Sequence, residues 1–278
     1  MPDLRVWTAS DDYPIAVASW KPTGKPIGRV VVLHGVQSHQ GWYHGLGNRL
    51  AARGFETHFP DRRGSGSNHK DRGHTPSWRR LVEDVGEFVS SLGAELPVAI
   101  VGISWGGKLA VLAASQYAGK MQAIALLCPG LQPRVGVSRL ERLQITLAYF
   151  MKRRKMFRIP LSDPALFTAS TSGQSFIAND PLALREASAG LLAASRFIDR
   201  AAVKAPPLIR QPALLMLASE DRIIDNALTR TYFDRIASTD RTIIEYPGAH
   251  HTLEFEPNPA IHADDLARWL TMKIGPRS

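Results

Sequence analysis

The sequence predicts an α/β protein in which a mostly parallel sheet of eight strands carries helices on both faces. Short apolar runs of strand length alternate with longer segments of helical spacing, which is typical of right-handed βαβ units. The alternation stops at Pro129-Gly130 and resumes after Pro206-Pro207. We therefore expect one core interrupted by a helical insertion. The expected division is 1–129 for the first part of the core, 130–207 for the insertion and 208–278 for the second part of the core.

The expected strands are short runs that are either continuously apolar or alternate between apolar and polar residues. The first two runs alternate and are separated by Asp11-Asp12, which predicts an antiparallel hairpin at a sheet edge. Continuous apolar runs such as 29–33 are typical of strands that are buried on both faces. The eight ranges are 4–10, 13–20, 29–33, 55–60, 98–101, 121–127, 212–217 and 242–246.

Helical spacing fills the intervals between these strands. Ser77 is well placed to cap the helix that follows it. The expected core helices cover 42–53, 78–92, 108–117, 226–236 and 259–273. Within the insertion we expect no strand. One helix there is marked by Leu140, Leu143, Leu147 and Phe150, and a second covers 181–200.

Length and composition suit one large domain. The chain has 278 residues, of which 44% are hydrophobic, so it has enough apolar side chains for a sizeable core. A single cysteine, Cys128, lies in an apolar run and is expected to be a buried, inert thiol. The first residues lack a basic segment followed by an apolar one, and no stretch is long enough to span a bilayer. We therefore expect a cytoplasmic, soluble protein.

Positive charge is concentrated in the insertion. Residues 131–206 hold 12 Lys and Arg against 5 Asp and Glu, whereas the rest of the chain holds 22 against 20. The apolar helix of the insertion runs into Lys152-Arg153-Arg154-Lys155. This basic run is either a solvated helix end or part of an interfacial helix that contacts an anionic membrane. No aromatic interleaving or recognition motif accompanies it, so we expect no nucleic-acid partner.

A candidate nucleophile lies where one strand passes into a helix. Gly102-Ile103-Ser104-Trp105-Gly106 follows an apolar run and precedes a helical segment. Small residues on both sides allow a tight turn that raises a serine hydroxyl at the carboxyl end of the strand, as in a nucleophile elbow. Taken alone, the motif is a weak signal, and the alternative is a serine that only caps the helix. Residues that could act together with Ser104 must therefore decide between the two interpretations.

Two later strands end in residues that suit those partners. The run 212–217 leads into Ser219-Glu220-Asp221-Arg222, and the run 242–246 leads into Gly248-Ala249-His250-His251. Carboxyl ends of parallel strands meet at one edge of a sheet, so these acids and histidines are expected near Ser104. A histidine that takes the serine proton and a carboxylate that orients the histidine complete a nucleophilic triad.

The chain resembles the α/β-hydrolase superfamily, in particular its monoacylglycerol lipase and lysophospholipase-like branch. Three further segments carry the resemblance over nearly the whole chain. His34-Gly35-Val36-Gln37-Ser38-His39 is similar to the HGxxxH segment of that branch, and Asp61 to Ser67 is similar to its D-x-RG-x-G-x-S loop. The insertion lies where the family has its cap. Trp105 departs from the smaller or more flexible residues that commonly follow the nucleophile.

The resemblance implies a function and a set of residues. It assigns His251 rather than His250 as the catalytic histidine, while strand-end position favours Asp221 over Asp225 as the acid. Backbone N–H groups of Val36 and Trp105 are the implied oxyanion hole, and His34 braces the loop that carries Val36.

The expected activity is hydrolysis of a small-molecule carboxylic ester through an acyl-enzyme on Ser104, without cofactor or metal. Thioester hydrolysis, acyl transfer and carbon–carbon bond hydrolysis on the same triad remain alternatives, as does a non-catalytic ligand receptor.

Overall fold

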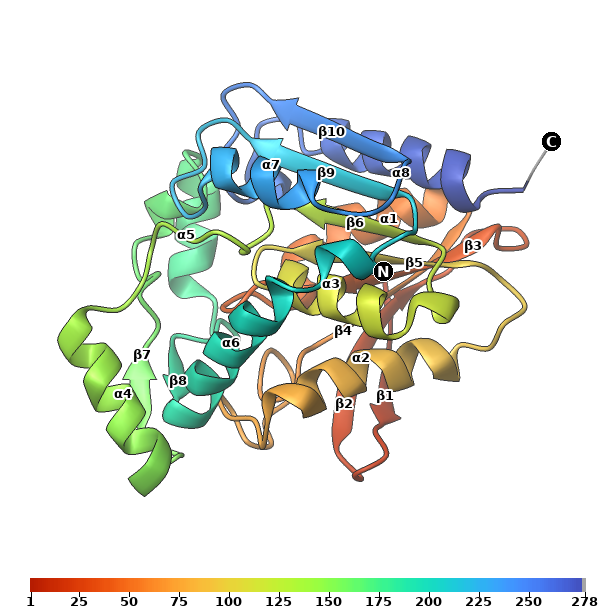
Figure 1. Ribbon diagram of the computed structural model, residues 1–278. Coiled ribbons are helices and arrows are strands. Elements are labelled where there is room, and N and C mark those ends of the chain that lie inside the picture. Colours follow the sequence, from red (N-terminus) through yellow and green to blue (C-terminus); the bar gives the residue numbers. More distant parts are fainter. Residues whose placement is uncertain (277–278) are drawn as a thin grey trace.

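A computed structural model describes residues 1–276, and its centre is an eight-stranded sheet with the order β1-β2-β4-β3-β5-β6-β9-β10 (Figure 1). β1 pairs antiparallel with β2, β2 pairs antiparallel with β4, and the remaining neighbours are parallel. The mostly parallel sheet with an antiparallel hairpin at one edge is therefore confirmed. The strands are β1 (Asp3–Thr8), β2 (Pro14–Trp20), β3 (Gly28–Leu33), β4 (Phe55–Pro60), β5 (Val98–Ile103), β6 (Ala123–Leu127), β9 (Ala213–Ala218) and β10 (Arg241–Tyr246).

Burial explains the composition of the strands. Every residue of β5, β6 and β9 is buried, because helices cover both faces of the sheet there. β10 forms the opposite edge and alternates between exposed and half-buried residues. Continuous apolar runs therefore mark the centre of the sheet, and alternation marks its edges.

Two groups of helices cover the sheet (Figure 1). α1 and α8 pack together on one face, while α2, α3 and α6 pack on the other. The Ser77 hydroxyl accepts a hydrogen bond from the Arg80 N–H and caps α2, as expected. The helices outside the insertion are α1 (His44–Ala52), α2 (Trp78–Ser91), α3 (Gly106–Gln116), α7 (Asn226–Asp234) and α8 (Ala260–Ile274).

The insertion differs from the expected pair of helices. Three α-helices occur there: α4 (Arg139–Met151), α5 (Thr171–Asn179) and α6 (Ala189–Ala202). The predicted start of the second helix, at residue 181, is therefore wrong, because α6 begins at Ala189. Two strands, β7 (Met156–Arg158) and β8 (Glu186–Ser188), form a small antiparallel sheet, so the expectation of no strand is also wrong. Strands of three residues are too short to show a hydrophobic period.

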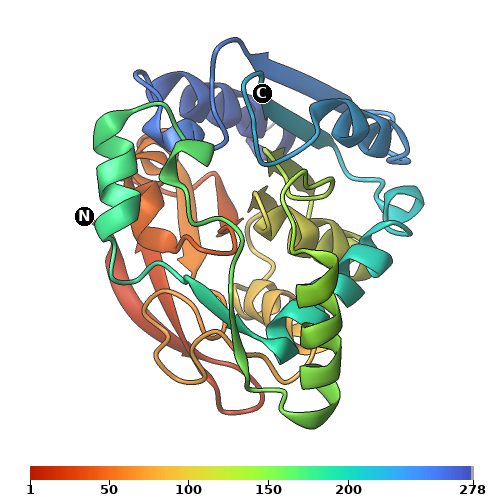
Figure 2. The ribbon, with the colours of Figure 1, turned by 90° about the vertical axis from the view of Figure 1, so that its left-hand side faces the viewer.

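The insertion lies in front of the carboxyl ends of the parallel strands (Figure 2). α6 joins α2 and α3 in the helix layer, whereas α4 contacts α6 and lies at the periphery. The carboxyl edge of the sheet is therefore bordered by α4, α5 and the small β7–β8 sheet. Among residues 1–276, no helix combines the length and hydrophobicity needed to cross a membrane.

Candidate active site

Ser104 occupies a sharp turn between β5 and α3. Its φ of 51° lies in the left-handed region, which a residue with a side chain rarely adopts. The turn requires glycine two residues before Ser104 and two residues after it. A Cβ at Gly102 would lie 2.6 Å from the Cβ of Ala110, and one at Gly106 would collide with the Leu33 carbonyl. The G-x-S-x-G pattern therefore follows from the close approach of the strand and the helix.

Ser104, His251 and Asp221 form one line of hydrogen bonds at the carboxyl edge of the sheet. The Ser104 hydroxyl lies 2.8 Å from Nε2 of His251, and Nδ1 of His251 lies 2.7 Å from Oδ2 of Asp221. The other carboxylate oxygen of Asp221 accepts hydrogen bonds from the N–H groups of Ile223 and Ile224. With its proton on Nδ1, the imidazole donates to Asp221 and leaves Nε2 free to accept from Ser104.

The rival residues lie in other environments. The Asp225 carboxylate accepts from the Leu228 N–H and caps α7. This capping hydrogen bond is the largest of the effects that lower the pKa of Asp225. The backbone N–H of His250 donates to Glu256, and the His250 ring lies 3.4 Å from the same carboxylate. Neither Asp225 nor His250 belongs to the hydrogen-bonded line.

The segment after β3 passes directly beside Ser104. A Cβ at Gly35 would lie 3.0 Å from the Ser38 hydroxyl and 3.3 Å from the Ser104 Cβ, which is tighter than ordinary van der Waals contact, so this approach favours glycine. Among residues 1–276, the backbone N–H groups of Val36 and Trp105 donate to no protein acceptor. Trp105 directly follows Ser104 and precedes the first turn of α3. The structure thus brings both N–H groups of the expected oxyanion hole to the turn that carries Ser104.

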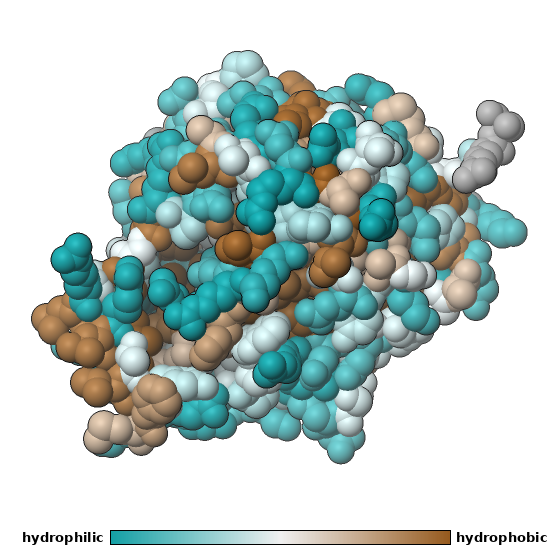
Figure 3. Space-filling model, in the orientation of Figure 1, coloured by the Kyte–Doolittle hydropathy of each residue, from teal (hydrophilic) through white to brown (hydrophobic). Residues whose placement is uncertain are grey.

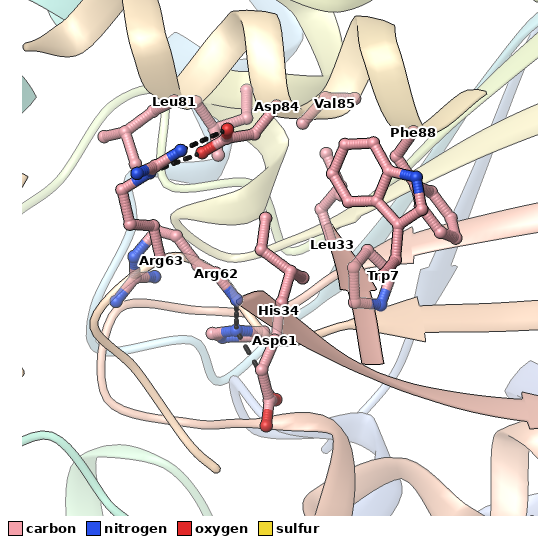
Figure 4. A pocket seen from close by; sticks show the side chains of 13 residues that line it. Trp7, Leu33, His34, Asp61, Arg62, Arg63, Leu81, Asp84, Val85 and Phe88 are labelled. Atoms are coloured by element: carbon pink, nitrogen blue, oxygen red, sulfur yellow. Dashed lines mark hydrogen bonds and ion pairs between the residues drawn. The ribbon is translucent and has the colours of Figure 1, made fainter. Parts of the chain in front are cut away.

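His34 braces this segment as a neutral imidazole. Its Nε2 accepts from the Arg62 N–H at 2.8 Å (Figure 4). The proton therefore lies on Nδ1, which donates to the Gly35 carbonyl at 2.8 Å. Burial places the pKa of His34 well below its ordinary value, and the positive charge of Arg62 lowers it further. The role expected for His34 as a brace agrees with these contacts.

The loop 61–67 packs against the segment that follows β3 and holds it through hydrogen bonds. Asp61 accepts from the N–H groups of Gln40 and Ser67 at 2.9 and 2.8 Å. Arg63 pairs with Asp84 of α2 at 2.7 Å, as Figure 4 shows. A cavity of about 30 Å³ lies between this loop and α2, and Arg62 contributes to its lining. The ion pair between Arg63 and Asp84 joins the loop to α2. The Arg62 side chain is directed toward the segment after β3 that passes beside Ser104.

Two contacts of the candidate site are not foreseen from the sequence. The buried Arg62 guanidinium reaches the Gly35 and Val36 carbonyls, and the Phe167 ring of the insertion meets the His251 ring edge to face with centroids 6.1 Å apart. Arg62 stands at a variable position of its loop motif, and Phe167 lies in a segment without a clear period. No sequence pattern singles out either residue.

Comparison with known proteins agrees with the fold. A serine on a strand-to-helix elbow, bonded to histidine and aspartate from later strand ends, defines an α/β-hydrolase. The profile of the family described as "Serine aminopeptidase, S33" matches residues 24–258. The chain therefore belongs to this family, within the α/β-hydrolase superfamily and its monoglyceride lipase branch, and it is a hydrolase.

Among its relatives is the monoacylglycerol lipase of Mycolicibacterium smegmatis, which is 27% identical over 92% of this chain and 92% of that protein. The monoglyceride lipase of Homo sapiens is 26% identical over 91% of this chain and 86% of that protein. The crystal structure of the Paleococcus ferrophilus monoacylglycerol lipase superposes with a TM-score of 0.84 at 24% identity, covering 93% of this chain and 99% of that one. This last likeness concerns the fold.

Proposed function

We propose that the chain is a serine hydrolase of carboxylic esters and that monoacylglycerol or lysophospholipid-like acyl esters are its substrate class. The single observation that carries the proposal is the hydrogen-bonded line from Ser104 through His251 to Asp221. The names of the relatives support the substrate class.

The proposed reaction has two halves. Ser104 attacks the acyl carbonyl while His251 takes its proton, and His251 then returns this proton to the leaving alcohol as the acyl-enzyme forms. Water attacks the acyl-enzyme with His251 again as the base, which releases the fatty acid and restores Ser104. Asp221 holds the imidazole in the required tautomer and stabilises its protonated form. No cofactor takes part.

Charge develops on the carbonyl oxygen in both halves. The backbone N–H groups of Val36 and Trp105 are the proposed donors to this oxyanion. Trp105 belongs to the turn that carries Ser104, and the carbonyl of the peptide that contains the Val36 N–H accepts hydrogen bonds from His34 and Arg62, so both donors are held before the substrate arrives. Such preorganised donors stabilise the transition state without the reorganisation that water would need.

We propose that the segment 130–207 acts as a cap over the substrate. Phe167 lies against His251, and the insertion borders the carboxyl edge of the sheet (Figure 2). The α6 helix packs with α2 and α3 in the core layer. Within the segment 130–207, α6 therefore anchors the cap to the core, and the residues before Ala189, where α6 begins, are the part proposed to cover the substrate.

We also propose that the cap contacts an anionic membrane surface. The stripe of large apolar residues on α4 faces solvent rather than the core, as in Figure 3, where apolar side chains gather over the position of α4. Only Ile145 and Ala148 of this helix are buried. The exposed basic run Lys152 to Lys155 follows directly. The exposed apolar residues are Leu140, Leu143, Leu147, Phe150 and Met151, which are 54–79% exposed.

Hydrolysis assays with the purified protein test the ester proposal. The substrates are 1-oleoylglycerol, short and long p-nitrophenyl esters, an acyl thioester and a peptide p-nitroanilide. A fluorophosphonate probe should label the wild type and the matched control Ser115→Ala, whose serine lies further along α3, but not Ser104→Ala. Loss of the nucleophile should lower kcat by about 10⁶.

Each outcome separates the candidate functions. Labelling or ester hydrolysis that persists in Ser104→Ala overturns the assignment of the nucleophile. Faster turnover of the thioester or the peptide than of every oxygen ester replaces the ester proposal by a thioesterase or a peptidase. A protein that binds the ester without turnover is a receptor on the same fold.

A further inference from the structure

We propose that Arg62 is a positioning residue for the oxyanion hole, because its guanidinium orients the peptide that carries the Val36 N–H and supports the Trp105 side chain. The inference rests on the proposed function and deepens it. Arg62 itself touches no reacting atom in this mechanism; it acts through the backbone of the segment 35–36 and through residue 105.

The contacts of Arg62 are directional. Nη1 donates to the Gly35 carbonyl at 3.0 Å, and Nη2 donates to the Val36 carbonyl at 2.9 Å and to the Ser65 hydroxyl. A planar guanidinium with fixed N–H directions can hold two consecutive carbonyl groups at once, which an ammonium group cannot do with the same geometry. The side chain therefore constrains both peptide groups that flank Val36.

The Gly35 carbonyl and the Val36 N–H belong to the same peptide group. This peptide is trans, so its carbonyl and its N–H point in opposite directions. Arg62 and His34 both donate to this carbonyl and so hold it in one direction. The Val36 N–H is consequently directed to the opposite side, where the proposal places the carbonyl oxygen of the substrate. Two donors on the carbonyl also polarise the peptide and strengthen its N–H as a donor.

Arg62 also contacts the side chain of Trp105, the residue whose backbone N–H is the second proposed donor. Its guanidinium carbon lies 4.8 Å from the centroid of the Trp105 ring, within the range of a cation–π interaction. The indole N–H of Trp105 donates to the Ser195 hydroxyl on α6 at 2.9 Å, so the ring is held from both sides. Arg62 thus contacts both residues whose N–H groups form the proposed oxyanion hole.

Burial shows that this arrangement is specific. Arg62 is only 8% exposed and Trp105 only 6%. Burial lowers the pKa of Arg62 to about 10, which leaves the guanidinium protonated at neutral pH, and the neighbouring Asp61 carboxylate favours the charged form. A charge held in this environment is costly unless it is compensated. Here the compensation comes largely from the carbonyl groups of the active-site segment.

The test compares Arg62→Gln with Arg62→Lys and with a matched control, Arg72→Gln. Arg72 also donates to backbone carbonyls, those of Gly66 and Leu182, but touches neither Gly35 nor Val36. Arg62→Gln should lower kcat by about 10- to 100-fold and leave KM within about 2-fold, somewhat less than complete loss of an oxyanion donor. Arg62→Lys should recover part of kcat, and Arg72→Gln should keep the wild-type kcat.

Inhibitors give a second readout that a merely structural role would not change. A trifluoromethyl ketone forms a tetrahedral adduct with Ser104 whose oxyanion needs the hole, whereas an alkyl glyceryl ether resembles only the bound substrate. In Arg62→Gln the ketone should bind more weakly by the factor that kcat/KM loses, and the ether should bind as before. Equal weakening of both, or a higher KM at unchanged kcat, overturns the inference.

Two results keep the conclusions apart. Ester hydrolysis in Ser104→Ala overturns the assignment of Ser104 as the nucleophile, and with it the proposed mechanism. An inactive Ser104→Ala together with a fully active, folded Arg62→Gln overturns only the inference about Arg62. If Arg62→Gln does not fold, the Arg62→Lys variant decides, since an unchanged kcat in that variant contradicts the need for the two-carbonyl contact.

Discussion

The backbone N–H of Thr252 donates to the carbonyl of Phe167 at 2.9 Å, which ties the insertion to the loop that carries His251. The Phe167 ring packs against both His251 and Trp42, with ring centroids 6.1 and 5.9 Å apart. The insertion is therefore attached to the active site at the residue next to the catalytic histidine of the proposed mechanism. Changes in the insertion should reach the chemistry through this contact.

Replacing Phe167 by alanine should affect stability and turnover together. Phe167 is buried, and its loss leaves a cavity beside His251, so we expect about 3 kcal/mol of lost unfolding free energy. We expect kcat to fall by roughly 10-fold, because misplaced reacting groups lose rate steeply. Urea unfolding and p-nitrophenyl ester kinetics measure the two effects. Phe176→Ala, a partly exposed aromatic of α5, is the control for insertion packing; wild-type kcat in Phe167→Ala would contradict the coupling.

Asp221→Asn should keep the fold and lower kcat by about 10⁴, because an amide at this position favours the wrong imidazole tautomer. The control is Asp225→Asn, which changes the cap of α7 and the ion pair with Arg134 and should keep nearly all activity. Steady-state kinetics and circular dichroism of both variants provide the measurement. The reverse ranking of the two variants would assign the carboxylate to Asp225.

Glu254 and His262 form a buried pair, 3.6 Å apart, whose pKa values move in opposite directions. Burial raises the pKa of Glu254 to about 7 from 4.5 and lowers the pKa of His262 to about 4 from 6.5. Stability from Glu254 is therefore lost as pH rises from 4.5 to 7, whereas stability from His262 is lost as pH falls from 6.5 to 4. Between pH 4.5 and 6.5 both the folded and the unfolded pair hold one proton, so the two slopes cancel.

Glu254→Gln should remove this compensation. The variant should lose unfolding free energy, on the order of 2 kcal/mol relative to wild type, as pH falls from 6.5 to 4.5, because only the His262 effect remains. His262→Gln should show the opposite slope. Urea unfolding across this pH range measures both variants, and parallel curves for wild type and Glu254→Gln would mean that the pair is not protonated as described.

Vesicle binding tests the proposed membrane contact. Each cation near an anionic bilayer contributes about 1 kcal/mol, and salt screens this attraction over about 10 Å at 0.1 M. Binding should increase with phosphatidylglycerol content, weaken with salt and disappear when the four residues Lys152 to Lys155 become glutamine, while hydrolysis of a soluble short-chain ester stays unchanged. Sedimentation with vesicles provides the measurement.

A charge-matched control makes this result specific to the cap. Four exposed cations on other surfaces are replaced by glutamine in the control, which should bind vesicles like wild type. If the wild type ignores phosphatidylglycerol vesicles even at low salt, the basic run is a solvated helix end. The control residues are Arg5, Lys21, Lys25 and Lys120.

The sequence by itself determined the sheet and the placement of the candidate site. Strand-length apolar runs separated by helical segments leave few topologies other than a parallel sheet with right-handed crossovers. Because such a sheet gathers the carboxyl ends of its strands at one edge, Ser104, Asp221 and the pair His250-His251 are expected there from their positions, and the family resemblance selects His251 from the pair. Local patterns suffice for these conclusions, since each depends on residues adjacent to a single strand.

Only the tertiary structure decided which side chains meet. A helical period reveals the apolar stripe of α4 but not that it faces solvent, because exposure depends on what packs against it. The three-residue strands β7 and β8 gain their identity from pairing with each other. Arg62 and Phe167 are distant in sequence from the residues that they contact in the candidate site. Contacts between distant segments produce no hydrophobic period, so a sequence pattern cannot predict them. The groups proposed to react can be recognised from the sequence pattern immediately around each of them. The residues that orient these groups come from distant segments and are brought together only by folding.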